Sequence, residues 1–258
     1  MMNTENNAPS KVVAISGGTS GLGFAVALGF CEAGYQTCLI SRNEEQGEMA
    51  QFELSRAGFG SYFFKCDVRN ENEVESTYLK IFNQFQRLDS AINCAGILDS
   101  GNGVNLTESE FDDVISTNLK GTWLSMKYQV PIMKKTGQGN IVNIASILAF
   151  HGSSGNSAYV ASKHGIIGLT KTFALENLNF NIRVNAIAPG FLDTPMLDRI
   201  FQKNPDKRRK IQNLMKTKKF IPLNNVTKSV LWLCSTESAS INGQCIVVDE
   251  GLTAGYSL

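Results

Sequence analysis

The chain has almost no net charge, few histidines and no long apolar run. Its 24 lysines and arginines against 23 acidic residues leave a formal net charge of +1, which argues against a nucleic-acid partner. With 2 histidines, and 6 cysteines that show no C-x-x-C spacing, we predict no metal site and reduced cysteines in the core. No run reaches the roughly 18 apolar residues of a membrane span, and the first ten residues are polar, so we expect a cytoplasmic protein without a membrane partner.

The chain also lacks an internal repeat and a Pro/Gly/Ser-rich linker. Apolar strands and helical segments alternate along its whole length instead, which predicts a doubly wound α/β fold with a parallel sheet between two layers of helices. We therefore predict a single dinucleotide-binding domain over residues 11–258, after a disordered tail over residues 1–10. Residues 108–134 read as one or two helices that bend near Asn118 and Gly121, since both residue types disfavour a helix interior.

A glycine-rich loop joins the first strand to the first helix. The strand KVVAIS runs into GGTSGLG and then into the helical stretch FAVALGFCEAG, an arrangement that brings backbone amides and a helix N-terminus to a pyrophosphate. Gly17, Gly21 and Gly23 have a G-x-x-x-G-x-G spacing, which differs from the common G-x-G-x-x-G fingerprint. The position of this loop between a strand and a helix favours a nucleotide site.

The second strand, QTCLIS, ends at Ser41 and Arg42, about 20 residues past the loop, where a dinucleotide site meets the adenosine ribose. An NAD site prefers a carboxylate there, whereas arginine and serine suit a 2′-phosphate. NADP is therefore favoured and NAD is the alternative. Arg42 could instead be a solvated residue, and Glu44 and Glu45 would weaken a phosphate site if they pointed inward.

Tyr159 and Lys163 stand four residues apart in a predicted helix, so a phenol and an ammonium share one face. Lowering a phenol pKa from about 10 to about 7 takes roughly 4 kcal/mol, which a cation at about 4 Å supplies at an effective dielectric near 20. Ser146 ends the apolar run NIVNIAS and would lie at the same sheet edge. The three residues suit proton transfer at an alcohol or carbonyl oxygen. Such Tyr–Lys pairs also occur without chemistry, and the neighbouring motifs favour the catalytic interpretation.

Several motifs then resemble those of the short-chain dehydrogenase/reductase family, from about Lys11 to Ala254. They are SGGTSGLG, CDV, NCAG, NLKG, the serine at 146, YVASK and NAIAPGFLDT. The chain resembles 3-oxoacyl-(acyl carrier protein) reductase-like and glucose dehydrogenase-like members. The resemblance implies a Rossmann fold with a seven-stranded sheet and an NAD(P)-dependent oxidoreductase. It also implies four catalytic residues, with a water between the first and last of them, namely Asn118, Ser146, Tyr159 and Lys163.

The resemblance also assigns the cofactor and substrate residues. The residues expected at the pyrophosphate are Gly17, Thr19, Ser20, Gly21, Leu22 and Gly23, and those expected at the adenine are Asp67 and Val68. The ribose groups are expected to contact Asn93, Ala95, Gly96, Tyr159 and Lys163, and the nicotinamide carboxamide is expected to contact Pro189, Gly190, Leu192 and Thr194. The residues expected at the substrate are Ser146, Leu148 and Tyr159. Asp67 could alternatively cap the following helix. An apolar pocket is suggested by Ile97, Leu98, Leu148, Phe150 and Phe191, although such residues also form ordinary core.

Three departures from the family pattern stand out. Ser16 replaces the usual threonine, the glycine loop lacks the basic residue that many NADP-preferring relatives carry, and Glu250 stands where a glycine is usual. By resemblance, residues 194–220 form a substrate lid, and the protein assembles as a homotetramer or homodimer. The lid segment is strongly basic, which favours either an anionic or carrier-bound substrate or a solvated amphipathic helix with Ile200, Ile211 and Leu214 inward.

The predicted reaction is hydride transfer between NADP(H) and a carbonyl or secondary alcohol, with Tyr159 as acid or base. One alternative is an NAD-dependent alcohol, sugar or steroid dehydrogenase of the same fold. A non-catalytic nicotinamide redox sensor would be expected to have lost catalytic positions, yet all four are filled. A lyase or epimerase with transient cofactor use would differ in showing no net oxidation of the cofactor.

Overall fold

The computed structural model describes residues 10–98, 103–203, 205–215 and 217–255, apart from the side chains of residues 199, 200, 203 and 205. Most of the tail predicted over residues 1–10 lies outside this part of the chain. At the centre is a 7-stranded sheet of order β3-β2-β1-β4-β5-β6-β7 in which all neighbours pair in parallel. This confirms the predicted doubly wound fold.

The strands are short and apolar on both faces. In β1, Val13 and Ile15 join one hydrophobic cluster while Val12 and Ala14 join another, because successive side chains point to opposite faces. The strands are β1 (Val12–Ser16), β2 (Gln36–Ser41), β3 (Ser61–Lys65), β4 (Ser90–Asn93), β5 (Gly139–Ile144), β6 (Ile182–Pro189) and β7 (Cys245–Val248).

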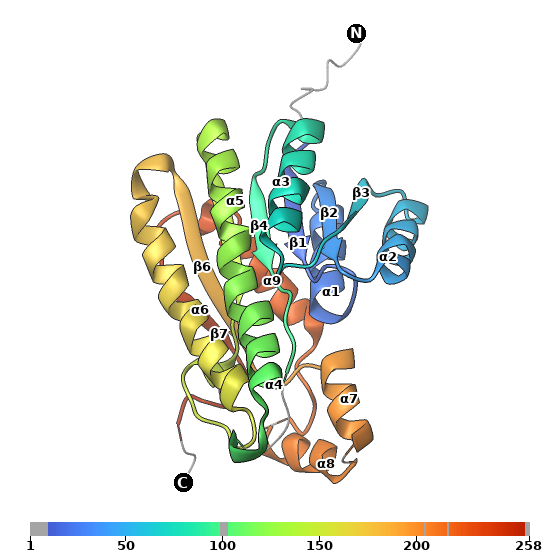
Figure 1. The fold of residues 1–258 in the computed structure, drawn as a ribbon, viewed down its shortest axis with the longest axis vertical. Helices are drawn as coiled ribbons and strands as arrows, with labels where there is room; N and C mark the ends of the chain where they lie inside the picture. The colour runs from blue at the N-terminus through green and yellow to red at the C-terminus, as the bar shows by residue number, and fades with distance from the viewer. Residues whose placement is uncertain (1–9, 99–102, 204, 216, 256–258) are drawn as a thin grey trace.

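Helices cover both faces of the sheet (Figure 1). Side chains of α1 and α9 pack together with odd-numbered β1 residues on one face, and α3 and α5 cover the other face beside α6. The helices are α1 (Gly21–Glu32), α2 (Glu44–Arg56), α3 (Glu71–Phe85), α4 (Glu108–Val114), α5 (Gly121–Thr136), α6 (Ser157–Glu176), α7 (Pro195–Lys203), α8 (Pro205–Leu214) and α9 (Leu223–Leu233).

The bend predicted between residues 108 and 134 is a π-helix. The segment η2 (Ile115–Lys120) joins α4 to α5 and contains Asn118. Directly after it, Gly121 lies close to the loop that follows β3, and an added Cβ would come within 2.8 Å of Val68 Cγ2. A π-helix changes the direction of the side chains that follow it, and such insertions often occur at functional sites.

The helices α7 and α8 lie below the carboxyl ends of the strands (Figure 1). Ile211 is buried, as predicted for an amphipathic helix, but Leu214 is 62% exposed, so the prediction that it points inward is wrong. Leu214 is the last residue of α8, and the residue directly after it, Met215, is the one buried in the main hydrophobic cluster. The side chain of Ile200, also predicted to point inward, lies outside the described part of the chain. Glu250 has φ +54°, a backbone conformation that suits glycine better than glutamate.

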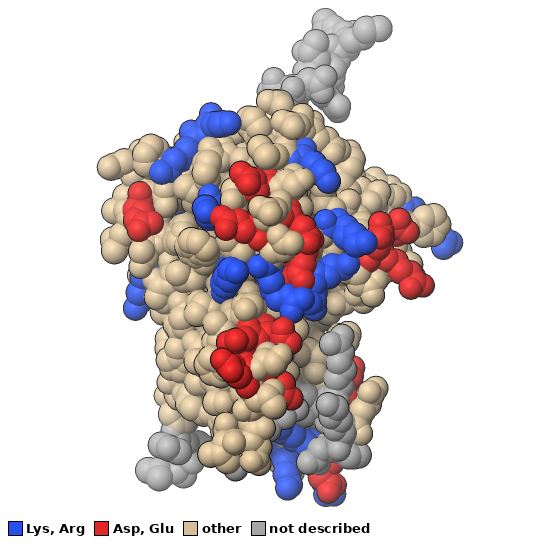
Figure 2. Space-filling view, viewed as in Figure 1, with Lys and Arg blue, Asp and Glu red and all other residues tan. Residues whose placement is uncertain are grey.

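Basic and acidic side chains are interspersed on the face that carries α3, α5 and α6, and acidic side chains gather over α4 (Figure 2). In the described part of the chain, no helix has both the length and the apolar character needed to cross a membrane. Over the same residues, no group of three His, Cys, Asp or Glu side chains could hold a metal ion.

Candidate active site

A cavity of about 250 Å³ opens at the carboxyl ends of the central strands. In doubly wound sheets this edge is where ligands bind, because the strand order reverses there and leaves a crevice. Its lining comes from the glycine loop, the ends of β4, β5 and β6, and the first turns of α6 and α7. The lining residues are Gly17, residues 20–23, residues 94–96, Leu98, residues 144–148, Tyr159, Lys163, residues 189–192 and residues 194–197.

The glycines of the loop allow the backbone to come close to a ligand. Gly17 has φ +68°, and a Cβ there would lie 2.9 Å from the backbone of Ala95 across the cavity. A Cβ on Gly23 would lie 2.0 Å from the carbonyl oxygen of Gly17. Any side chain at either position would therefore break the loop, which forms a smooth backbone wall of the kind that a dinucleotide pyrophosphate needs.

The N-terminus of α1 faces this cavity without a side-chain cap. Ser20 is the N-cap residue, yet its side chain makes no capping hydrogen bond, and no acidic residue stands in the first turn. Other helices of the protein do have caps, such as α2, where Asn43 accepts from the Gln46 amide. The free amides of Gly21 and Leu22 and the helix dipole favour an anion, so the loop fits the pyrophosphate of a nicotinamide dinucleotide.

Tyr159 and Lys163 lie on the first turns of α6 and both line the cavity. The amino group of Lys163 is 5.4 Å from the centre of the Tyr159 ring and donates to the Ile144 carbonyl at 2.7 Å. Burial lowers the pKa of Lys163 to about 8. The positive charge of the amine favours a phenolate at Tyr159, and it does so only while the lysine is protonated.

Ser146 follows β5 and lines the same cavity. Its backbone is extended and its Oγ accepts from the Leu148 amide at 3.2 Å, which fixes the hydroxyl oxygen. No described residue accepts the hydroxyl hydrogen, which remains able to donate to a ligand oxygen. The structure thus brings together a serine hydroxyl, a phenol and a buried amine around one space, as the sequence predicts.

Asn118 lies behind the cavity and does not line it. Its side chain exchanges two hydrogen bonds with Ile97, at 2.8 Å to the amide and 2.9 Å to the carbonyl, and donates to Ser162 Oγ at 3.1 Å. The main-chain carbonyl of Asn118 accepts from Thr122 Oγ1 at 2.7 Å. Asn118 therefore fixes the loop after β4 against α6, next to Lys163.

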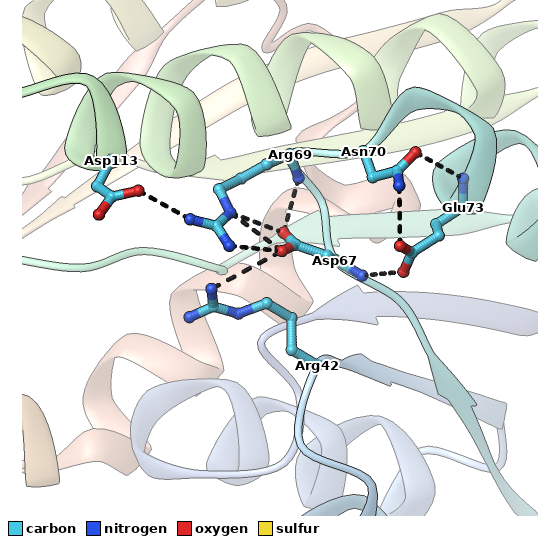
Figure 3. Close-up of polar contacts among 6 residues, drawn as sticks. All are labelled: Arg42, Asp67, Arg69, Asn70, Glu73 and Asp113. Carbon is cyan, nitrogen blue, oxygen red and sulfur yellow. Dashed lines mark hydrogen bonds and ion pairs between the residues drawn. The ribbon is translucent and has the colours of Figure 1, made fainter. Parts of the chain in front are cut away.

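The residues predicted for the adenosine end lie further along the sheet edge (Figure 3). Asp67 accepts from Arg69 Nε at 3.0 and 3.1 Å and from Arg69 Nη2 at 2.8 Å, while Arg42 Nη1 lies 3.8 Å from the same carboxylate. Arg69 also reaches Asp113 at 2.9 Å. Burial opposes ionisation of Asp67, but the hydrogen bonds and charge of Arg69 outweigh it and hold its pKa below the usual value.

Other predicted cofactor residues do not reach the cavity with their side chains. Thr19 is buried and its hydroxyl donates to Gln46 on α2 at 3.5 Å. Asn93 is buried, donates to Asn143 Oδ1 and accepts from Gln129 Nε2, both at 2.8 Å. Its side chain therefore links β4 to β5 and α5 and does not face the cavity. Val68 packs against Gly121, and Ser41 ends β2 beside Arg42.

Part of the lining has no signal in the sequence. Cys94, Ile144, Met196 and Leu197 line the cavity although they read as ordinary strand or helix residues. Of the residues suggested by their apolar character, Leu98, Leu148 and Phe191 line it. The prediction is wrong for Ile97 and Phe150, which do not line it; Phe150 is 46% exposed. Arg69 is a further residue missed by sequence reasoning, since its role depends on Asp113, 44 positions away. Only the fold shows that these residues meet.

Comparison with known proteins gives the same assignment. A family model described as enoyl-(acyl carrier protein) reductase matches residues 17–253. The chain is 34% identical to the 3-oxoacyl-(acyl-carrier-protein) reductase FabG of Thermotoga maritima, over 94% of this chain and 97% of that protein. It is 36% identical to carbonyl reductase family member 4 of Xenopus laevis, over 94% and 98% of the two chains.

Solved structures are similar over nearly the whole chain. A variant of actinorhodin polyketide ketoreductase with NADPH superposes with a TM-score of 0.91 at 29% identity, covering 94% of this chain and 97% of that one. Levodione reductase gives a TM-score of 0.90 at 32% identity, with 95% and 98% covered. The chain belongs to the short-chain dehydrogenase/reductase family. It is an NAD(P)-dependent oxidoreductase of carbonyl or CH–OH groups, as its motifs predict.

Proposed function

We propose that the protein reversibly reduces a carbonyl compound to a secondary alcohol with NADPH, and that Tyr159 supplies the proton. The observation that carries this proposal is the convergence of Ser146, Tyr159 and Lys163 on one cavity beside the glycine loop. Similarity to an NADPH-containing ketoreductase and to FabG supports the same chemistry. When bound, the nicotinamide supplies the hydride in reduction and accepts it in alcohol oxidation.

Each side chain has a separate task. Ser146 donates its hydroxyl hydrogen to the substrate oxygen and holds it near the phenol. Tyr159 gives that oxygen its proton in reduction and takes it back in oxidation. Lys163 favours the phenolate through its charge and bonds the nicotinamide ribose. Both ends of the Asn118 amide are occupied, so a water that links Asn118 to Lys163 binds the Asn118 main-chain carbonyl.

The proposed cofactor is NADP(H), with NAD(H) as the alternative. Arg42 lies at the end of β2, and its side chain is 49% exposed and so accessible to a 2′-phosphate. Glu44, which could have repelled a phosphate, is turned to Lys65 at 2.7 Å. Arg42→Ala should raise the Kd of NADPH about tenfold or more while leaving that of NADH nearly unchanged. Equal losses for both cofactors would show that Arg42 does not bind the phosphate.

The reaction itself is tested by a screen of substrates. Simple ketones, β-ketoacyl thioesters, sugars and steroids would each be mixed with the protein and NADPH, and cofactor oxidation followed by absorbance. We expect net oxidation with at least one carbonyl class and formation of the matching alcohol. Turnover of a substrate without net cofactor oxidation would indicate a lyase or epimerase instead. NADPH binding without turnover of any carbonyl would favour the redox sensor.

We further propose that α7 and α8 form a lid that attracts an anionic or carrier-bound substrate. Lys207, Arg209 and Lys210 lie on α8, and Arg209 and Lys210 are exposed. This helix packs against α7, whose first residues line the cavity. Such a surface speeds association with an acidic partner in a salt-dependent way. Added salt should lower kcat/KM for an acyl thioester on an acidic carrier and leave that for a small neutral ketone unchanged. Equal salt responses would contradict this role.

The assembly is proposed to be a homodimer or homotetramer in the cytoplasm. Large apolar side chains remain exposed on the outer helices and on the edge strand β7, including Trp123, Leu175 and Val247. Burying them against a second copy would favour association. Light scattering at several concentrations should give the mass of two or four chains, and a monomer throughout would contradict the proposal.

A further inference from the structure

The carboxylate of Asp67 lies at the cofactor edge of the sheet, where a negative charge opposes a 2′-phosphate. It follows β3 and comes within 3.8 Å of Arg42 Nη1, the guanidinium proposed to hold that phosphate. An unpaired carboxylate at this place would repel the phosphate and would also draw Arg42 into a two-point ion pair. An NADPH site that contains both residues therefore needs the charge of Asp67 to be balanced by another group.

Arg69 supplies that balance. Its Nε donates to Asp67 Oδ1 at 3.1 Å and to Oδ2 at 3.0 Å, and its Nη2 donates to Oδ2 at 2.8 Å. The Arg69 backbone amide also donates to Oδ1 at 3.0 Å. The contact from Arg42, at 3.8 Å, exceeds hydrogen-bond length. Asp67 is thus fully engaged by Arg69, and the Arg42 guanidinium keeps its donors for a ligand (Figure 3).

A second acidic residue holds Arg69 in this orientation. Its Nη1 donates to Asp113 at 2.9 Å, on α4, over which acidic side chains gather (Figure 2). The guanidinium therefore bridges two carboxylates from segments far apart in the sequence. Because Nε, Nη1 and Nη2 all have acidic partners, Arg69 is placed to neutralise Asp67 rather than to bind a phosphate itself.

We propose that Arg69 is a positioning residue that sets the preference for NADPH by neutralising Asp67, so that Arg42 is free to bind the 2′-phosphate. This inference rests on the proposed NADP(H) preference. Removing the Arg69 charge should let Asp67 capture Arg42 and repel the phosphate, while a cofactor without the phosphate should be little affected. Removing the Asp67 charge as well should reverse the loss, because the carboxylate is the only cause of it.

The test is a set of dissociation constants measured by calorimetry, which need no turnover. The ligands are NADPH and NADH, with adenosine 2′,5′-bisphosphate and AMP as matched fragments. In Arg69→Gln the preference for the 2′-phosphorylated ligand should fall roughly five- to tenfold. The double variant Asp67→Asn/Arg69→Gln should recover the wild-type preference, and Asp67→Asn alone should keep it.

A matched control is available at the opposite end of the sheet. Arg87 donates to the carboxylate of Asp89, also two residues away, from Nε at 2.8 Å and from Nη2 at 2.6 Å. Arg87→Gln should cost stability without changing the cofactor preference, which separates a general loss of folding from the proposed effect.

The outcomes separate this inference from the cofactor proposal. If wild type prefers NADPH through Arg42, but Arg69→Gln weakens all four ligands equally, the inference is overturned and the cofactor proposal stands. The same holds if Asp67→Asn fails to rescue Arg69→Gln, since Arg69 would then contact the phosphate directly. If wild type binds NADH as tightly as NADPH and Arg42→Ala changes neither, both are overturned.

Discussion

Lys163 is a buried amine beside a phenol, and this single placement governs the proposed chemistry. Burial lowers its pKa to about 8, so the lysine loses its charge, and with it the attraction to a phenolate, as the pH rises through 8. Turnover should therefore decline as the pH rises above about 8, and a pH profile of kcat measures this decline.

The buried charge of Lys163 should also cost stability in a pH-dependent way. Its pKa falls from the ordinary lysine value of 10.5 to about 8 in the folded protein, so the unfolded chain binds this proton more tightly. The folded state is then penalised increasingly as the pH falls from 10.5 toward 8, and by a constant amount of about 3 kcal/mol below 8.

Lys163→Met removes this penalty. The free energy of unfolding of this variant minus that of wild type should therefore be about 2 kcal/mol larger at about pH 7.5 than at about pH 9.5. Urea denaturation at each pH measures this difference. Activity should be lost at the same time. A difference between the two proteins that does not change with pH would show that Lys163 is not charged in a buried site.

The sequence predicts some of these residues and not others, for a physical reason. Tyr159 and Lys163 are one helical turn apart, so their proximity follows from helix geometry alone. The partners of Arg69 and the buried bonds of Asn93 depend on side-chain directions in the folded protein, which spacing does not specify. The Tyr159–Lys163 pair proposed for the reaction was therefore predictable from spacing, and the contacts of Arg69 and Asn93 were not.

At the scale of elements, α7 and α8 are joined by one arginine. Arg208 lies over the stacked rings of Phe201 and Phe220, 5.3 and 5.2 Å from their centres, and its guanidinium is 3.3 Å from both Asp193 and Asp198. This side chain links α8 to α7 and to the segments on either side. The first residues of α7 line the cavity, so the link fixes one wall of the proposed substrate site.

Arg208→Ala should therefore act on substrate binding. We expect the substrate KM to rise roughly fivefold with little change in the Kd of NADPH, because α7 loses its support while the glycine loop is untouched. Steady-state kinetics and calorimetry give the two values. Lys228→Ala is the matched control, since Lys228 is an exposed cation on α9, outside the proposed lid. Equal effects of the two variants, or a selective loss of NADPH binding, would contradict the role of Arg208.

Element boundaries followed from the sequence where local chemistry determines them. Asparagine and glycine within residues 108–134 predicted a bend, and the structure has a π-helix there, a form that composition does not distinguish from a kink. The inward position predicted for Leu214 was wrong because Met215, one residue further on, is buried in the hydrophobic cluster instead.

At the scale of the whole molecule, one partly buried guanidinium joins the C-terminal segments to the sheet. Arg183 on β6 donates to the carbonyls of Leu233, Ser235, Ser238 and Ile241 at 2.8 to 3.0 Å. These carbonyls lie at the end of α9 and on the path to β7, so Arg183 adds charge-assisted hydrogen bonds where the helix ends. The order of the outer strands thus depends on a residue that reads as polar within a strand.

Arg183→Met should remove four charge-assisted hydrogen bonds to the C-terminal segments and lower the free energy of unfolding by about 3 kcal/mol. Urea denaturation measures the loss, and Arg183→Lys should recover only part of it because an ammonium reaches fewer carbonyls. Cofactor affinity should stay near wild type below the unfolding transition. An Arg183→Met protein with the wild-type free energy of unfolding would show that the C-terminal segments do not depend on these bonds.

The overall architecture was predictable because the strands are apolar on both faces and alternate with helices, which leaves a doubly wound parallel sheet as the consistent arrangement. The role of Arg183 was not, since its four acceptors lie 50 to 58 positions away.

The Tyr159 phenol is proposed to move the proton while the rest of the site binds and orients the reactants. The most direct test of this role is Tyr159→Phe, which removes one oxygen from the cavity wall and leaves the ring. With the best substrate of the carbonyl screen, kcat should fall about 10³-fold while the Kd of NADPH stays within about twofold of wild type. A variant that turns over at close to the wild-type rate would contradict the account.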